Sequence, residues 1–189
     1  MTELPLFPLN TVLFPGGALP LRIFETRYID MVSHCLKSQQ GFGICLIQEG
    51  GATGKAKMHR VGTVAEIGDW SRGEDGLLNI LAKGTKRFRV VSTRIQSDGL
   101  NLGEMEFLPE DPLLPVPENQ RQLAEILRQV LLQLEAEHTE LDYSDAGWVG
   151  NRLAEVLPIS LAQRQYLLEV EPLKRLEILQ TLVQSLSVN

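Results

Sequence analysis

The chain has 189 residues, of which 43% are hydrophobic and 22% are charged, and its formal net charge is −6. This length and composition are typical of a globular protein with one large domain or two small units. The excess of acidic residues argues against a dedicated nucleic-acid binder, which usually carries a basic domain or a strong basic stripe.

The chain opens with a nearly uncharged stretch, PLFPLNTVLFPGGALPLRIFE (residues 5–25), that contains four prolines. A secretory signal needs a basic start and an apolar helix, but Arg22 is the first basic residue and the prolines would break such a helix. No other segment has the roughly 18 uncharged apolar residues of a membrane-spanning helix. We therefore expect a soluble, cytoplasmic protein that does not contact membranes. Cys35 and Cys45 are too few for a disulfide framework, so we expect two buried thiols in a reducing compartment.

A second proline cluster, PEDPLLPVP (residues 109–117), favours extended backbone and forbids a continuous helix. It predicts a boundary between two parts of the chain, residues 1–112 and residues 113–189. The first part carries 12 basic and 13 acidic residues, and the second carries 6 and 11. The second part therefore holds most of the acidic excess.

Residues 1–112 have the pattern of a β-rich unit. Short apolar runs alternate with turn signals, among them FPGGA, in which Gly16 and Gly17 can adopt positive φ. One helix is expected, over residues 25–39, because four apolar residues recur at spacings of three and four: Tyr28, Met31, Val32 and Cys35. Several short strands at even spacing predict a small barrel or sandwich.

Residues 113–189 have the pattern of a helical bundle, so the predicted fold class is α+β. An apolar stripe runs through residues 118–135, and another, from Leu173 to Leu186, marks the last helix. The expected helix starts are residue 118, Ser144 or Asp145, the capping box of Ser160 and Gln163, and Pro172.

Signatures of catalysis, metal binding and cofactor binding are missing. His34, His59 and His138 do not stand at metal-ligand spacings. GGATGKAK (residues 50–57) is one residue short of a phosphate-binding loop and lacks its hydroxyl, and no nucleophile elbow occurs. We therefore expect no enzyme activity, no catalytic residue, no metal and no cofactor.

Three residues are candidates for binding a partner. KGTKRFRVVSTR (residues 83–94) contains Arg87 and Arg89, which share one face of a strand and could form a basic patch for RNA or phosphate. The alternative is the outer face of a half-buried strand with Phe88 in the core. Trp70 precedes a polar segment and could anchor a partner or cover the mouth of the barrel.

The opening segment, PLFPLNTVLFPGGALPLRIFETRYIDMV (residues 5–32), resembles the start of the N-terminal, substrate-binding domain of Lon-type ATP-dependent proteases. RVGTVAEI and DGLLNILAKGTKRFRV resemble later strands of that domain, and LPISLAQRQYLLEVEPLKRLEIL resembles its closing helices. The resemblance implies a PUA-like pseudobarrel followed by a helical bundle. A complete Lon protease continues into ATPase and peptidase modules whose motifs are missing, so the resemblance implies a stand-alone, non-catalytic domain.

Three functions remain open at this point. The resemblance implies a module that binds unfolded or tagged protein segments and works with a Lon-type protease. A PUA-like barrel could instead bind RNA, although the net charge makes nucleic acid the less favoured partner. A small ligand could also occupy a cleft lined by Arg22, Glu25 and Arg27, unless these residues only form ordinary ion pairs.

Overall fold

A computed structural model of the chain describes residues 2–49, 57–134 and 141–186. The chain divides into two compact units, Met1–Glu110 and Asp111–Asn189. This division lies two residues before the boundary expected from the second proline cluster.

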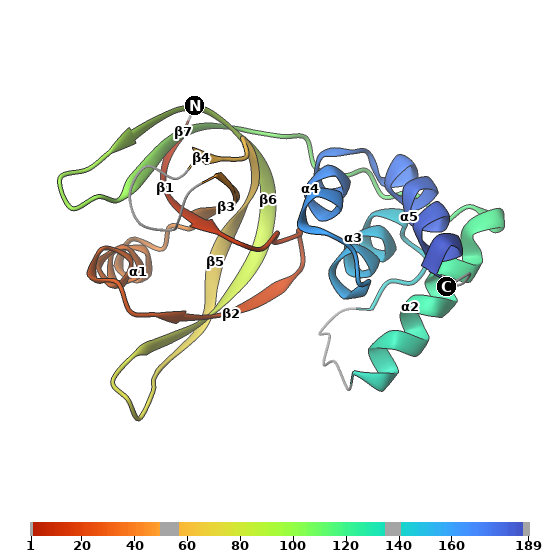
Figure 1. Cartoon of the computed structure of the whole chain (residues 1–189), viewed down its shortest axis with the longest axis horizontal. Helices are drawn as coiled ribbons and strands as arrows, with labels where there is room; N and C mark the ends of the chain where they lie inside the picture. Colours follow the sequence, from red (N-terminus) through yellow and green to blue (C-terminus); the bar gives the residue numbers. More distant parts are fainter. Residues whose placement is uncertain (1, 50–56, 135–140, 187–189) are drawn as a thin grey trace. The chain divides into compact units, whose positions relative to one another are not determined.

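The first unit is built on a seven-stranded sheet (Figure 1). Its strands are β1 (Thr2–Leu9), β2 (Ala18–Ile23), β3 (Phe42–Glu49), β4 (Lys57–Met58), β5 (Val61–Arg72), β6 (Leu78–Ile95) and β7 (Asn101–Phe107). The strands β1, β7, β6, β5 and β3 neighbour one another in that order, and β1 also pairs with β3 in parallel. The β1–β3 pairing closes these strands into a ring, while β2 pairs with β6 outside it.

The opening stretch forms β1, a tight turn and β2, and thus belongs to the core of this unit. Gly16 takes a φ of 74° and donates its N–H to Gly84 O at 2.8 Å, while Gly84 returns a bond to Gly17 O. A side chain at Gly84 would collide with the Phe14 carbonyl, so this approach requires glycine. The predicted glycine turn is confirmed.

The one helix among the described residues of the first unit, α1 (Thr26–Ser38), buries the predicted face of Tyr28, Met31, Val32 and Cys35. The Tyr28 ring stacks on Phe7 of β1, with centroids 4.0 Å apart. Burial raises the pKa of the Cys35 thiol to about 11 and that of the Cys45 thiol to about 12. Both cysteines are buried and reduced, as expected.

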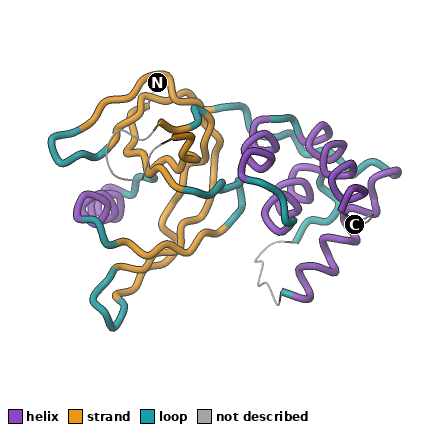
Figure 2. The backbone as a smooth tube through the Cα atoms, in the orientation of Figure 1, coloured by secondary structure: helices purple, strands orange, loops and turns teal. Residues whose placement is uncertain are grey.

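The second unit consists of helices (Figure 2). They are η1 (Glu118–Gln120), a short 3-10 helix, α2 (Arg121–Gln133), α3 (Ala146–Val156), α4 (Leu161–Glu169) and α5 (Pro172–Leu186). Asp145 caps α3 by accepting the Trp148 N–H, and Ser160 and Gln163 form the predicted capping box of α4. α3 contacts α2, α4 and α5, and its fully buried Val149 and Leu153 form the centre of the bundle.

The predicted class, α+β with a β-rich barrel followed by helices, is confirmed. One local expectation was wrong: the helix predicted from residue 118 begins as a 3-10 turn, and its α-helical part starts at Arg121. The apolar face predicted for α5 is also only partly buried. Leu176 and Leu179 are buried, whereas Leu173, in the first turn of α5, is 40% exposed and Leu186, its last residue, is 43% exposed.

Candidate functional site

Arg87 and Arg89 do not form an exposed basic patch. Arg87 is only 8% exposed and donates to the Pro109 carbonyl at 3.5 Å, so it is not available as a surface cation. Arg89 is exposed, but its register partner on β7 is Glu106, which offsets its positive potential. Phe88 lies between them and is fully buried, as the strand alternation predicted.

Trp70 lies on β5 opposite Ile80 of β6, and 57% of its surface is exposed. Its register partner Ile80 is a buried member of the core cluster of the first unit, so Trp70 lies beside that cluster near the end of β5. Its large exposed indole is compatible with a role in binding a partner.

Arg22, Glu25 and Arg27 form ordinary ion pairs. Arg27 pairs with Glu25 at 2.8 Å and donates to Gly99 O at 2.7 Å, while Arg22 pairs with Asp75 in the turn of the β5–β6 hairpin. These contacts fasten loops of the first unit to one another. They support the structural alternative for these residues over a ligand-binding role.

Within residues 2–49, 57–134 and 141–186, no group of three His, Cys, Asp or Glu side chains is arranged to hold a metal ion. None of the helices in those ranges is long and apolar enough to cross a membrane. His138 and residues 50–56 of the glycine-rich GGATGKAK segment lie outside the described residues.

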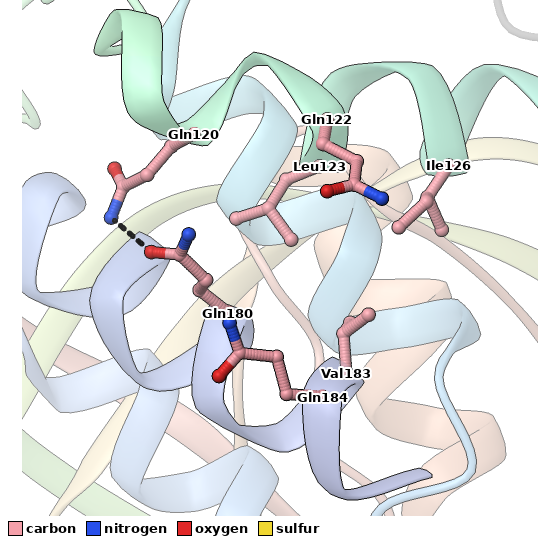
Figure 3. A pocket seen from close by; sticks show the side chains of 7 residues that line it. All are labelled: Gln120, Gln122, Leu123, Ile126, Gln180, Val183 and Gln184. Atoms are coloured by element: carbon pink, nitrogen blue, oxygen red, sulfur yellow. Dashed lines mark hydrogen bonds between the residues drawn. The ribbon is translucent and has the colours of Figure 1, made fainter. Parts of the chain in front are cut away.

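A groove of about 360 Å³ lies between α2 and α5 in the second unit (Figure 3). Its apolar floor consists of Leu123 and Ile126 from α2 and Val183 from α5, whose side chains project toward one another. Four glutamine side chains surround this floor: Gln120, Gln122, Gln180 and Gln184. The residues that line the groove are all uncharged.

Two of the glutamines are held in place by hydrogen bonds. Gln120 Nε2 donates to Gln180 Oε1 at 3.4 Å, and Gln180 Nε2 donates to the Asn119 carbonyl at 3.2 Å. The Gln120 side chain is buried, whereas Gln122 and Gln184 are exposed. One end of the rim is therefore fixed, and the exposed amides remain accessible to a partner.

The groove exists because the apolar stripe of α2 is wider than the surface that its neighbours cover. Leu123, Leu127 and Leu131 are buried, whereas Ile126 and Val130 along one side of the stripe are only half-buried. The sequence predicted this stripe, but helical spacing alone does not indicate which of its sides is covered. The sequence pattern alone therefore does not identify the residues of the groove.

The groove is complementary to a peptide that carries an apolar side chain. The floor can take up an aliphatic group, and its volume is at the lower end of the range for ligand pockets. Each glutamine amide offers a donor and an acceptor, so the rim can bond the N–H and C=O groups of a peptide whatever its sequence. Because the lining is uncharged, salt should affect such binding little.

Comparison with known proteins identifies the family of the chain. Residues 3–185 match the family model of the ATP-dependent protease La (LON) substrate-binding domain. The chain is 27% identical to a Lon protease from Anaeromyxobacter dehalogenans over 183 residues, which are 90% of this chain and 22% of that protein. It is 29% identical to a protein cereblon from Xenopus tropicalis over 133 residues, which are 68% of this chain and 29% of that protein. The chain thus spans less than a third of the length of these two relatives.

Solved structures give the same result. A Lon N-terminal domain protein from Xanthomonas campestris is 39% identical and superimposes with a TM-score of 0.83, over 96% of this chain and 98% of that one. The N-terminal domain of the Mycobacterium avium complex Lon protease has a TM-score of 0.67 at 18% identity, over 94% of this chain and 96% of that one, which is a likeness of fold.

Proposed function

Because this chain belongs to the family of ATP-dependent protease La (Lon) substrate-binding domains, we propose that it is a non-catalytic module that binds unfolded polypeptide segments in the groove between α2 and α5. The observation that carries the proposal is the combination of an uncharged apolar floor with a rim of glutamine amides. A protein that selects unfolded segments has to recognise exposed apolar side chains and backbone amides, which folded proteins bury.

The family match supports the non-catalytic part of the proposal, because it concerns the substrate-binding domain and not an ATPase or peptidase domain. We propose a Lon-type protease as the recipient of the bound segments. RNA binding has less support, since Arg87 is buried and Arg89 faces Glu106. A small ligand between Arg22, Glu25 and Arg27 also has less support, because those charges are already paired.

Fluorescence anisotropy with a labelled, permanently unfolded polypeptide tests the proposal. The change is a double substitution, Ile126→Gln and Val183→Gln, which replaces part of the apolar floor by amides. Each lost aliphatic contact should weaken binding about tenfold, the equivalent of about 1.4 kcal/mol. Binding by the unaltered protein should change little between low and physiological salt, and an unlabelled folded protein should not compete.

The matched control is Leu132→Gln. Leu132 also lies on α2 and is 73% exposed, but it does not line the groove. We expect this variant to bind like the unaltered protein. If the double variant keeps full affinity while remaining folded, the groove is not the binding site. If the unaltered protein binds no unfolded polypeptide, the proposed function is wrong.

A further inference from the structure

One edge of β5 is left without a partner strand beyond its contact with β3. β3 pairs with β5 only at Thr63–Ala65, whereas β6 pairs with β5 as far as Arg72. Along residues 66–72 no described strand pairs with the opposite edge of β5, and the β5–β6 hairpin extends past the ring of strands (Figure 1). An edge of this kind presents backbone N–H and C=O groups to which another strand can bond.

Hydrogen bonds identify the backbone groups that face this edge. Gly73 N–H donates to Leu77 O at 2.8 Å, toward the other side of the hairpin. Because successive residues of a strand point their N–H groups to opposite edges, Arg72 and Trp70 direct theirs outward. Consistently, Trp70 N–H donates to the Asp69 carboxylate at 2.8 Å instead of to β6. The Asp69 side chain therefore caps one of the edge donors.

A pocket of about 260 Å³ lies beside this edge. Ile67 lines it together with Cys35 and Leu36 of α1. Ile67 pairs with Ala82 of β6, and Trp70 pairs with Ile80. Ala82 and Ile80 are two residues apart and so point to the same face of β6. The register shift at Gly68 therefore brings Ile67 and Trp70 to one face of β5, although they are three residues apart. A strand added at this edge would direct alternate side chains toward this pocket and toward the exposed Trp70 indole.

We propose that residues 66–72 of β5 bind an extended segment of an unfolded polypeptide as an added β-strand. The proposal rests on the proposed function for the nature of the partner, and it adds a second contact, on the first unit, to the contact proposed for the groove. The segment carries apolar residues at alternating positions, one for the pocket and one for Trp70. Glu66 and Asp69 are exposed at this edge against one exposed cation, Arg72, so basic residues are favoured over acidic ones beside Glu66 and Asp69.

The first test changes only the ligand. The probe is a labelled peptide of about ten residues that alternates valine with threonine or lysine, since a strand of this length covers the free edge. Two further versions carry N-methyl groups on alternate residues. One version blocks the N–H groups along one edge of the peptide strand, and the other blocks those along the opposite edge. Pairing along one edge predicts that one version loses at least about tenfold in affinity, through lost hydrogen bonds, while the other binds like the unmodified peptide. If both bind like the unmodified peptide, the proposal is wrong.

The second test changes the protein. Arg72→Pro removes an outward N–H, and proline is tolerated where a strand's N–H faces solvent, so the β5–β6 pairing should survive. We expect about tenfold weaker peptide binding, against less than about twofold for the control Arg72→Ala, which keeps the N–H. Asp69→Ala should strengthen binding of the uncharged valine–threonine peptide, because it frees the Trp70 N–H and removes no attraction to a lysine. A gain in affinity could not arise from loss of the fold. Circular dichroism checks that each variant remains folded.

The outcomes separate this inference from the proposed function. If Arg72→Pro and Asp69→Ala bind the peptide normally while the double variant in the groove loses unfolded polypeptide, the edge inference is wrong and the proposed function stands. If no unfolded polypeptide binds at all, both are wrong. If the peptide does not bind and sedimentation detects a dimer that Arg72→Pro dissociates, the edge pairs with a second copy of this chain, which also overturns the inference.

Discussion

Asp111 and Arg175 form an ion pair, with 3.1 Å between Oδ2 and Nη1, although the Arg175 side chain is completely buried. The guanidinium also donates to the carbonyls of Leu167 at 2.8 Å and Val170 at 2.9 Å. Arg175 thereby joins α5, the end of α4 and the first residue of the second unit. The ion pair with Arg175 therefore links the start of the proline-rich segment, at Asp111, to the helices of the second unit.

Removing Asp111 should therefore destabilise the second unit. Asp111→Asn leaves the buried Arg175 without its counter-charge, and breaking a buried pair in this way typically costs about 3–5 kcal/mol. Urea denaturation followed by circular dichroism measures the loss. The control is Lys174→Met, which breaks an exposed pair with Glu177 on the same helix and should have little effect. A normal urea midpoint for Asp111→Asn would show that the pair contributes little to stability.

Gly62 should not tolerate a side chain. A Cβ atom there would collide with the Ile44 carbonyl oxygen, and it would lie 2.9 Å from the Phe88 ring. Because a backbone atom of the paired strand cannot move aside cheaply, we expect Gly62→Ala to lower the free energy of unfolding by about 1–3 kcal/mol. Gly68→Ala is the control, since its Cβ would meet the flexible end of Lys83. Thermal unfolding distinguishes the two, and equal melting temperatures would contradict this account.

The two thiols should be inert in the folded protein. Burial raises their pKa values from 9.0 to about 11 for Cys35 and about 12 for Cys45, so neither forms thiolate near neutral pH. A thiol-specific reagent such as DTNB at pH 8 should label neither residue until denaturant is added. Rapid labelling of Cys45 without denaturant would indicate that the first unit opens readily.

The same shifts predict how stability depends on pH. The folded pKa values lie above the unfolded value of 9.0, so the folded state holds these protons more tightly. Their contribution to stability is complete below pH 9 and is lost as the pH rises toward about 12. Cys45→Ala should reduce this loss, as measured by urea denaturation between pH 8 and pH 10. An identical pH dependence in both proteins would contradict the assignment to Cys45.

Charge reversal separates the roles of two arginines. Arg89→Glu changes an exposed side chain, and the like charge that it places opposite Glu106 should cost at most about 1 kcal/mol, so the fold and polypeptide binding should be retained. Arg87→Glu places a carboxylate in a buried position and should destabilise the first unit. Anisotropy with a short single-stranded RNA tests the alternative function. RNA binding that weakens with salt and disappears in Arg89→Glu would favour that alternative over the peptide-binding proposal.

The sequence by itself determined the features that depend on neighbouring residues. The buried face of α1 and the capping box of Ser160 and Gln163 follow from spacings of three or four positions, and the glycine turn has a local bond from Gly17 N–H to Phe14 O. Strand alternation likewise predicted the buried Phe88. The long opening motif added the family, and with it the expectation of a barrel followed by helices.

Only the tertiary structure decided which surfaces remain open. Spacing predicted the apolar stripe of α2, but the packing of α5 left Ile126 accessible beside Val183 and so created the groove. Strand periodicity placed Arg87 and Arg89 on one face, but a distant carbonyl, that of Pro109, covers Arg87 alone. The free edge at Trp70 exists because β3 begins at Phe42, opposite Ala65, and therefore does not reach residues 66–72 of β5. Each of these outcomes depends on contacts between segments far apart in the chain, and local patterns carry no information about such contacts.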